Sequence, residues 1–400
     1  MGQFVYLDHA ATTPLDQRVF KVMKPWLTDK FGNPSSFHSP GKEAKDTVEL
    51  ARTKISKILS CRIEEIIFTA GGTESDNLAI LGFARANVGA GKHIIVSAIE
   101  HHAVLEAAAQ LKKEGFEVTL VAPDTDGIVG LESIKAALRP DTILVSVMYA
   151  NNEIGTIQPV AEIGNFIQKH RGENKYPIFH TDACQAAGAF ELSVEKLHVD
   201  AMTINGSKIY GPKGVGLLYL RKDLRVQPLQ FGGAQERGLR PGTENVAGIV
   251  GLAEALELTD KEKNKEGERL IKLRDKLIAG ILSTVPKTKL NGHSTKRLPN
   301  NANISFLDIE GEALMLYLDA KGIYVSTGSA CTSASLDPSH VLLALGKSPE
   351  EAHGAMRFTL GHSTTEKDID YVLKVLPPLV EKLRMISTNP INTTPSPSNP

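Results

Sequence analysis

One cysteine near the end of the chain has surroundings that favour reactivity over packing. Cys331 lies in residues 326–335, a run made up of Gly, Ser, Ala and Thr apart from the cysteine. Buried cysteines usually pack among aliphatic side chains, whereas a thiol among small polar residues is expected to be accessible. The run therefore predicts sulfur chemistry at Cys331. An incidental cysteine in a flexible loop is the alternative that the run leaves open.

A lysine stands just beyond a strand-like run. Residues 201–204 have a strand pattern, and Lys208 follows in the glycine-bounded turn 205–214. A lysine at the carboxyl end of a strand is well placed to form a Schiff base with a carbonyl compound. A solvated turn lysine is the competing interpretation.

A carboxylate ends another strand-like run. Asp182 follows residues 178–181 with no cation close in sequence. Such a carboxylate can keep a pyridinium nitrogen protonated, and it can equally cap a helix over 183–187. Gln185, taken alone, is typical of a polar surface residue.

Two further patterns follow strands. Gly72 and Thr73 lie between a strand and an apolar helical pattern, where free N–H groups and hydroxyls can bind phosphate. No GK[ST] sequence follows, and a plain capping turn explains the segment equally well.

His101 and its neighbour His102 can stack on an aromatic ring or move protons. Because no acidic or cysteine ligand stands at supporting spacing, no metal site is predicted.

An arginine interrupts an apolar strand pattern. Arg357 lies within residues 355–360. A guanidinium there needs an anion, and a substrate carboxylate would suit its planar fork. A structural salt bridge is the alternative.

Short strand-like runs alternate with amphipathic stretches between residues 65 and 220. This rhythm predicts an α/β fold with a largely parallel sheet covered on both faces and ligand groups at the strands' carboxyl ends. Residues 214–220 follow the preceding strand too closely for a crossover and are expected to be antiparallel. The predicted strands are 66–69, 93–97, 118–121, 143–147, 178–181 and 201–204. Two helices, 244–259 and 261–284, and strands at 304–307 and 355–360 predict a smaller α/β domain, completed by the N-terminal segment.

Composition limits the class of protein. A chain of 400 residues is expected to form about two domains. The net charge of −1 favours neither nucleic acid nor an anionic membrane as partner. Three cysteines without CxxC spacing argue for a reducing compartment, and no signal peptide or membrane-length apolar run is present, so a cytoplasmic location is expected. The polar, proline-rich end predicts disorder.

Taken in order, the motifs resemble those of cysteine desulfurases of the NifS/IscS type, in the aminotransferase class V family. These are pyridoxal 5′-phosphate enzymes of fold type I, the aspartate-aminotransferase fold. The resemblance covers nearly the full length and implies a large cofactor-binding domain (15–260), a small domain (1–14 and 261–386) carrying the cysteine loop, and a disordered tail (387–400). The matching segments are 6–14, 31–35, 72–77, 100–101, 151–155, 240–243, 328–335 and 357–358.

The resemblance implies a role for each matching residue. Lys208 would bind the cofactor covalently, Asp182 would pair with its ring nitrogen, and His101 would stack on the ring and act as acid or base. The other implied contacts are Asn152 and Gln185 to the phenolic oxygen; Gly72, Thr73, Asn205, Gly206 and Ser207 to the phosphate; Thr243 to the phosphate of a neighbouring subunit; and Arg357 with Asn33 to the substrate carboxylate.

The implied reaction converts L-cysteine to L-alanine. Lys208 takes the Cα proton, and the Cys331 thiolate attacks the substrate sulfur to form a persulfide. A homodimer and a sulfur-acceptor protein are implied as partners, with sulfur supplied to iron–sulfur cluster assembly, tRNA thiolation or nitrogenase maturation. Another lyase or aminotransferase of this fold, or a cofactor-free sulfur carrier, are the competing functions.

Two segments depart from the family pattern. Residues 205–208 read Asn-Gly-Ser-Lys, where many relatives have Ser-Gly-His-Lys. A phosphate-contacting imidazole is therefore absent, and the Ser207 hydroxyl is expected in its place. The C-terminal tail differs from the extended ending that docks the iron–sulfur scaffold, so that partner is not inferred from it.

Overall fold

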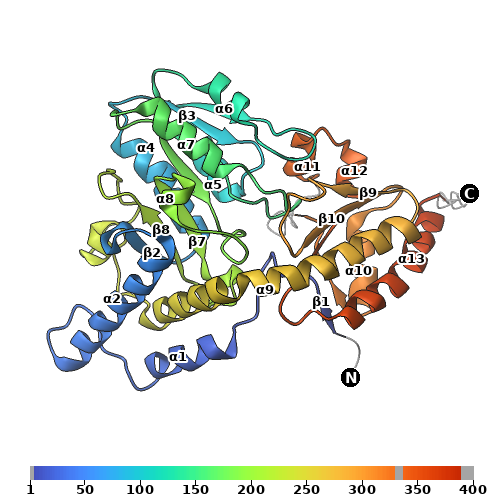
Figure 1. The fold of residues 1–400 in the computed structure, drawn as a ribbon, viewed down its shortest axis with the longest axis horizontal. Coiled ribbons are helices and arrows are strands. Elements are labelled where there is room, and N and C mark those ends of the chain that lie inside the picture. Colours follow the sequence, from blue (N-terminus) through green and yellow to red (C-terminus); the bar gives the residue numbers. More distant parts are fainter. Residues whose placement is uncertain (1–3, 329–336, 389–400) are drawn as a thin grey trace, which may run out of the picture.

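A seven-stranded sheet forms the core of the larger part of the computed structural model, which describes residues 4–328 and 337–388 (Figure 1). Its strand order is β2-β8-β7-β6-β5-β3-β4. The strands are β2 (Ile66–Thr69), β3 (His93–Ser97), β4 (Glu117–Val121), β5 (Thr142–Ser146), β6 (Ile178–Asp182), β7 (Ala201–Asn205) and β8 (Gly216–Leu220). All neighbours are parallel except β8, which is antiparallel to β7 and β2. The predicted strands and the antiparallel neighbour are confirmed.

Helices cover both faces of this sheet. On β3, Ile95 belongs to one buried cluster, and Ile94 and Val96 belong to another on the opposite face. Successive side chains of a strand point to opposite faces, so a strand that is apolar throughout needs cover on both. The first face packs against α2 (Ser39–Leu59), α6 (Leu131–Ala137), α7 (Val160–Arg171), α8 (Val194–Leu197) and the start of α9. The second packs against the π-helix η2 (Leu78–Gly82), α4 (Phe83–Ala86) and α5 (His102–Lys113).

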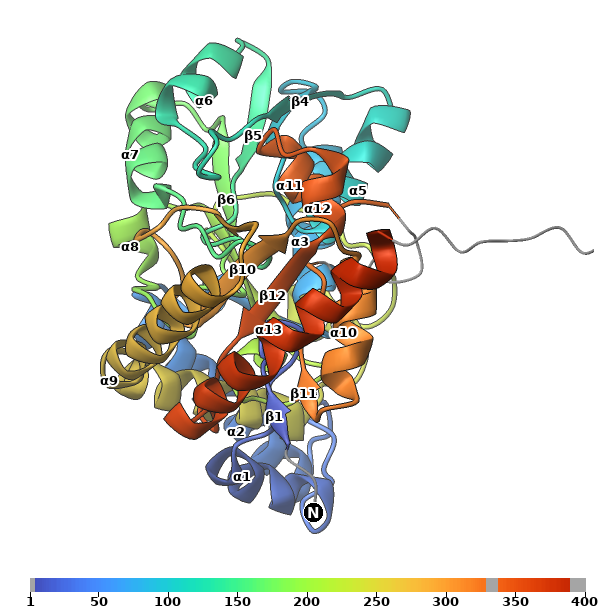
Figure 2. The same ribbon diagram turned by 90° about the vertical axis from the view of Figure 1, so that its right-hand side faces the viewer.

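A smaller part contains the C-terminal strands and the N-terminal strand. β10 (Asn301–Phe306) lies between β9 (Thr288–Asn291) and β12 (Ala355–Thr359) and is antiparallel to both. β1 (Val5–Tyr6) pairs in parallel with β11 (Ile323–Tyr324), so the N-terminal segment packs into the part formed by the C-terminal strands (Figure 2). The helices of this part are α10 (Gly311–Asp319), α11 (His340–Ala344), α12 (Pro349–His353) and α13 (Glu366–Thr388).

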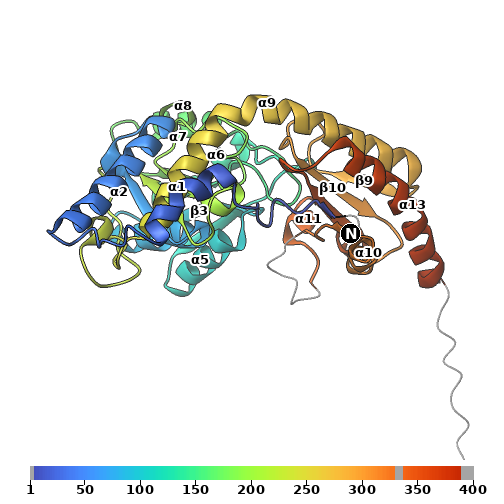
Figure 3. The same cartoon turned by 90° about the horizontal axis from the view of Figure 1, so that it is seen from below.

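One long helix joins the two parts. α9 (Val246–Thr284) is continuous over 39 residues, so the prediction of two helices, 244–259 and 261–284, is wrong (Figure 3). Its buried residues from Ala247 to Leu256 join the core of the larger part, and those from Leu270 to Ile281 join the core of the smaller part. The polar middle stays helical because ion pairs at helical spacing support it, including Lys261–Glu257 and Arg269–Glu266.

The remaining elements extend these parts. α1 (Gln17–Leu27) packs against α9, α3 (Gly72–Asn77) follows β2, and the short helices η1 (Ile63–Glu65), η3 (Gly206–Lys208) and η4 (Gln235–Gly238) lie in connections. α13 continues to Thr388, which extends two residues into the predicted tail; residues 389–400 lie outside the described ranges. Across residues 4–328 and 337–388, every helix is too short or too polar to span a bilayer.

Candidate active site

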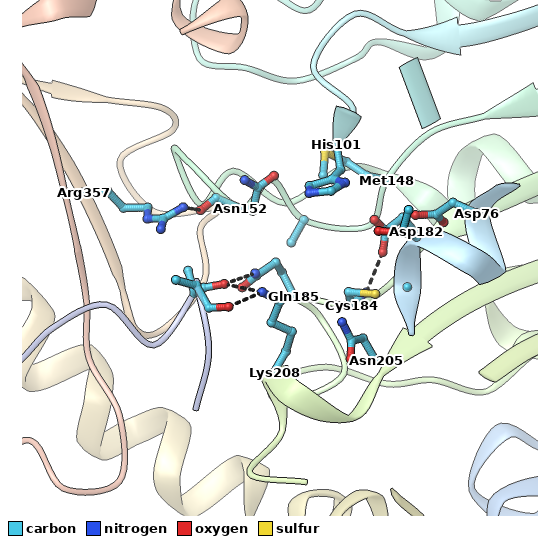
Figure 4. Close-up of a pocket in the computed structure, with 15 residues that line it drawn as sticks. Asp76, His101, Met148, Asn152, Asp182, Cys184, Gln185, Asn205, Lys208 and Arg357 are labelled. Atoms are coloured by element: carbon cyan, nitrogen blue, oxygen red, sulfur yellow. Dashed lines mark hydrogen bonds between the residues drawn. The ribbon is translucent and has the colours of Figure 1, made fainter. Parts of the chain in front are cut away.

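A pocket lies beyond the carboxyl ends of the central strands, where the larger part meets the smaller one (Figure 4). It has an empty volume of about 880 Å³, part of it open to solvent. Parallel strands of an α/β sheet carry ligand groups at this end. The lining residues are Ala10, Ala11, Gly72, Thr73, Asp76, His101, Met148, Ala150, Asn152, Asp182, Cys184, Gln185, Asn205, Lys208 and Arg357. The structure thus brings together most of the side chains that the sequence singled out.

Lys208 enters the pocket from the end of η3, directly after β7. Its Nζ donates hydrogen bonds to the carbonyl oxygens of Ala10 at 2.9 Å and Ala11 at 2.6 Å. Both acceptors belong to the N-terminal segment, which therefore forms one wall of the pocket. The amine lies in the cavity and is not the solvated turn lysine that the sequence left open.

Asp182 ends β6 at another wall of the pocket. Its Oδ1 accepts the backbone N–H of Cys184 at 2.8 Å. Residues 184–189 form turns, so Asp182 caps a turn and not the predicted alternative of a helix over 183–187. The carboxylate is 7 % exposed and faces the cavity.

His101 is the N-cap of α5 and lines the pocket above Lys208 (Figure 4). Its Nδ1 accepts the N–H of Ala103 at 3.1 Å. Burial lowers the pKa of His101 below its usual value, so the ring is predominantly neutral at pH 7. A neutral imidazole with its position fixed by the helix can stack on a ring and accept a proton. Across residues 4–328 and 337–388, no cluster of three His, Cys, Asp or Glu side chains could hold a metal ion.

The glycine at the start of α3 lies on the pocket wall in close contact with Cys184. A Cβ on Gly72 would lie 3.0 Å from the Cys184 sulfur, and Asn205 is the next neighbour. Gly72, Thr73 and Asn205 line the pocket, as the phosphate prediction requires. Ser207 does not line it, because both its N–H and its hydroxyl bond to Asn205 Oδ1.

Arg357 closes the pocket from β12, and its side chain is 2 % exposed. Its Nη2 lies 2.9 Å from Asp8 Oδ1, and its Nη1 donates to the Asn152 carbonyl at 3.1 Å. The salt bridge that the sequence left as the alternative is therefore present, and the residue also lines the cavity. Its Nε is buried without a protein partner among the described residues, which leaves a donor for a ligand.

Two amides complete this side of the pocket. Gln185 Nε2 donates to the carbonyl oxygen of Ala10 at 3.0 Å, so the side chain is a pocket residue and not the surface residue that its type alone indicated. Asn152 lines the same wall next to Arg357 (Figure 4).

Besides Gly206 and Ser207, three further predicted site residues are not brought to this pocket by the described chain. Asn33 lies in an exposed loop, where its side chain accepts the N–H of Ser35. Thr243 is exposed just before α9 and does not line the cavity. Cys331 falls within residues 329–336, outside the described residues.

Two pocket residues with ionisable side chains, Asp76 and Cys184, received no role from the sequence. Asp76 is 1 % exposed and its Oδ1 has no protein partner in the described chain. Cys184 is buried beside Asp182, and burial raises its thiol pKa, so it is a neutral thiol. Asp76 and Cys184 each lie in a segment in which the sequence pointed to a different residue. The folded chain directs their side chains into the cavity, and no local sequence pattern indicates that direction.

These side chains fit pyridoxal phosphate. The pocket offers an amine for the aldehyde, a carboxylate for the ring nitrogen, and Gly72 and Thr73 at the start of a helix for the phosphate. Asp76 and Arg357 also line this pocket, and each has a buried atom without a protein partner among the described residues, Asp76 Oδ1 and Arg357 Nε. The donor set therefore suits a phosphorylated pyridine aldehyde together with an amino acid carboxylate.

Comparison with known proteins gives consistent matches over almost the whole chain. The aminotransferase class-V family model matches residues 5–372. A cysteine desulfurase IscS of Methanosarcina thermophila is 53 % identical over 383 residues, covering 96 % of this chain and 93 % of the relative. The protein of the same name from Dictyoglomus turgidum is 52 % identical over 388 residues, covering 97 % of each chain.

Solved structures show the same likeness. A NifS-like protein superimposes with a TM-score of 0.88 at 40 % identity, covering 96 % of this chain and 100 % of the other. SspA, solved in complex with cysteine, gives a TM-score of 0.79 at 35 % identity, covering 89 % of this chain and 98 % of the other.

Proposed function

This chain belongs to the aminotransferase class V family and is a pyridoxal-phosphate-dependent cysteine desulfurase, and we propose that the pocket around Lys208 carries out its reaction. The observation that carries this assignment is the convergence of Lys208, Asp182 and Arg357 on one cavity. An amine, a carboxylate and a guanidinium there match the aldehyde, the ring nitrogen and the amino acid carboxylate that desulfuration brings together.

The residues that would hold the cofactor lie on three walls. Lys208 would bind its aldehyde, Asp182 its ring nitrogen, and His101 would stack on the ring. When bound, the cofactor stabilises negative charge at the Cα of an amino acid attached to it. The remaining proposed contacts are Gln185 and Asn152 at the phenolic oxygen and Gly72, Thr73, Asn205, Gly206 and Ser207 around the phosphate.

The chain's own groups would then bind the substrate and move protons. Arg357 would hold the L-cysteine carboxylate, and Lys208 Nζ would take the proton from Cα. His101, predominantly neutral because burial lowers its pKa, would accept a proton from the substrate thiol or amine. Asp182 would keep the ring nitrogen protonated throughout.

Sulfur transfer would occur at Cys331. Its thiolate would attack the sulfur of L-cysteine, so that a sulfur–sulfur bond forms as the bond from sulfur to Cβ breaks. The carbon fragment would take up protons and leave as L-alanine, and the balance is L-cysteine plus the Cys331 thiol giving L-alanine plus the Cys331 persulfide. A sulfur-acceptor protein would remove the outer sulfur for iron–sulfur cluster assembly or a thiolation pathway.

We also propose a homodimer in the cytoplasm. Phe31, Phe37 and Phe231 are large apolar side chains exposed to solvent, and Thr243 and Asn33 are exposed in the same loop regions. Contact with a second copy would cover these rings and would let Thr243 reach the partner's phosphate site.

We propose a larger domain of residues 15–260 and a smaller domain of residues 1–14 and 261–386. The boundary between them falls within α9, which the two parts share.

The deciding experiment measures alanine and sulfide released from L-cysteine with a thiol reductant. Cys331→Ala should keep the cofactor's visible absorption but lose sulfide release, and Lys208→Ala should lose both. Cys61→Ala is the matched control, since Cys61 lies outside the pocket and should leave both signals intact. Unchanged desulfuration by Cys331→Ala would refute the assignment of the nucleophile, and release of a keto acid would indicate an aminotransferase.

A further inference from the structure

Two carboxyl groups lie beside each other at one end of the pocket. Asp76 comes from α3 and Asp182 from the end of β6, and both point to the same wall (Figure 4). The side chains are 1 % and 7 % exposed. Neighbouring carboxylates in a buried wall repel each other, so one of the pair is expected to keep its proton.

Within the described residues, the histidine that faces Asp76 carries no positive charge at neutral pH. His180 Nε2 lies 3.7 Å from Asp76 Oδ1, but burial lowers the pKa of His180 to about 4, so the ring is neutral at pH 7. The Lys208 ammonium is turned to the carbonyls of Ala10 and Ala11. Glu100 is also fully buried near this wall, and burial raises its pKa to about 8, so it is predominantly a neutral acid at pH 7 and adds no cation.

A chain of hydrogen bonds fixes the neutral histidine. Its Nδ1 lies 2.9 Å from Ser146 Oγ and its Nε2 lies 3.2 Å from Thr203 Oγ1. With the proton on Nε2, Ser146 donates to His180, His180 donates to Thr203, and the Thr203 hydroxyl donates toward Asp76. This series of hydrogen bonds runs from Ser146 to Asp76, so Asp76 is the last member of a buried polar network.

The available donors decide which carboxyl is ionised. Asp182 Oδ1 accepts the Cys184 N–H at 2.8 Å, whereas Asp76 Oδ1 has no partner among the described residues. A buried, ionised carboxylate oxygen without a donor costs more than the same oxygen in a neutral carboxylic acid. Burial, together with the charge on Asp182, raises the pKa of Asp76 well above its usual value, in agreement with the geometry.

We propose that Asp76 is a positioning residue that stays a neutral carboxylic acid beside Asp182. In this state the negative charge at this end of the pocket rests on Asp182, and the buried network below it holds the wall in place. An ionised Asp76 would repel the negative charge of Asp182, and the two carboxylates would compete for one proton. The inference rests on the role of Asp182 proposed above, as the partner of the cofactor's ring nitrogen.

The test compares three variants of the full-length chain stripped of its cofactor. Pyridoxal phosphate is titrated into each, and the apparent dissociation constant is read from visible absorption. Asp76→Asn, which mimics a neutral acid, should stay within about twofold of the wild type, whereas Asp76→Ala should bind about two- to tenfold more weakly, as expected for loss of a neutral hydrogen-bonding group. Asp182→Asn should bind about ten- to a hundredfold more weakly, because it removes a charged partner.

The outcomes separate the two hypotheses. If Asp182→Asn binds like the wild type, the proposed role of Asp182 fails and this inference fails with it. If Asp182→Asn is weakened and Asp76→Asn is weakened equally, Asp76 is ionised and only this inference is overturned. An Asp76→Ala variant that binds normally also overturns it, since no positioning role is left.

A second measurement avoids the cofactor and any failure to bind it. The infrared C=O stretch of protonated carboxyl groups is recorded for the cofactor-free protein at pH 7. Asp76→Asn should remove part of this band, and Glu100→Gln should separately remove another part, because burial raises the pKa of Glu100 to about 8. A band unchanged by Asp76→Asn overturns the proposal, and melting curves of each variant confirm that the proteins compared are folded.

Discussion

Arg357 and Asp8, at opposite ends of the chain, form an ion pair with 2.9 Å between Nη2 and Oδ1. The pair joins β12 to the N-terminal segment whose carbonyls hold Lys208. Since the second guanidinium nitrogen donates to the Asn152 carbonyl, the arginine is fixed before any substrate arrives. Preorganisation of this kind reduces the entropy lost on binding a carboxylate.

Substitution at this pair should separate binding from orientation. Arg357→Lys removes the planar fork, and we expect KM for L-cysteine to rise about ten- to a hundredfold, as for loss of a charge-assisted bond. Asp8→Asn keeps the guanidinium but loosens it, so its KM should rise by a smaller factor. Alanine release at varied L-cysteine concentration measures both.

The control for this prediction is another buried arginine. Arg274 on α9 donates to the Leu298 carbonyl and lies outside the pocket. Arg274→Lys should therefore leave KM unchanged even if it lowers stability. A normal KM for Arg357→Lys would contradict the assignment of the carboxylate site.

The close approach of Gly72 to Cys184 gives a second prediction. A Cβ on Gly72 would lie 3.0 Å from the Cys184 sulfur, tighter than ordinary contact, so Gly72→Ala should push the sulfur into the cavity and weaken cofactor binding. Cys184→Ala removes the obstacle, and the double variant should bind more tightly than Gly72→Ala alone. Cofactor titration of the four proteins gives the coupling. Strictly additive effects would show that the contact is not the cause.

A buried ion pair supports the segment that leads to Thr243. Arg52 donates to both oxygens of Glu236, at 2.8 and 2.7 Å, and Glu236 has a left-handed backbone with φ of 43°. The same carboxylate accepts the N–H of Phe68. Arg52→Met leaves the buried Glu236 charge without this partner and should lower the free energy of unfolding by about 3–5 kcal/mol. Glu236→Gln should cost less, because Arg52 Nε keeps Glu49 at 3.2 Å.

Denaturant unfolding of the single and double variants tests this pair. Because the double variant leaves no unpaired charge, its loss of stability should be smaller than the sum of the two single losses. Arg139→Met, in an exposed ion-pair cluster with Glu117 and Asp141, is the control and should change stability little. Equal losses at Arg52 and Arg139 would count against the argument.

The strands and the site's main residues could be predicted from the sequence because their signals are local. Each central strand is a short apolar run, and Lys208, Asp182 and His101 follow such runs directly. The rule that ligand groups gather at the carboxyl ends of parallel strands then brought them together. The resemblance to a family supplied the cofactor and the reaction.

Features that depend on tertiary packing could not be predicted in this way. The polar stretch around Asp260 was interpreted as a break between helices, but packing of both ends of α9 into separate cores keeps it helical. Asp76 resembles an ordinary helix residue until the fold buries it next to Asp182. The pairing of Arg357 with Asp8 joins residues from opposite ends of the chain, and no local pattern indicates it.

The buried Glu100 predicts how stability depends on pH. Burial raises the pKa of this carboxyl from 4.5 to about 8 in the folded protein, while its Oε1 accepts the Met148 N–H. The folded state therefore keeps a proton that the unfolded chain releases near its usual pKa. Between pH 5 and 8 the unfolded state is favoured progressively, so this group lowers stability as pH rises and has no such effect below pH 4.5.

Glu100→Gln should remove this dependence, since an amide keeps an acceptor for Met148 and cannot ionise. We expect the free energy of unfolding of Glu100→Gln, relative to the wild type, to increase steadily from pH 5 to pH 8 in urea titrations of the cofactor-free protein. Glu114→Gln is the control, because hydrogen bonding to Arg85 lowers the pKa of Glu114 to about 2 and its difference from the wild type should stay flat in this window. A flat difference for Glu100→Gln as well would mean that the carboxyl is already ionised in the folded protein, contrary to its burial.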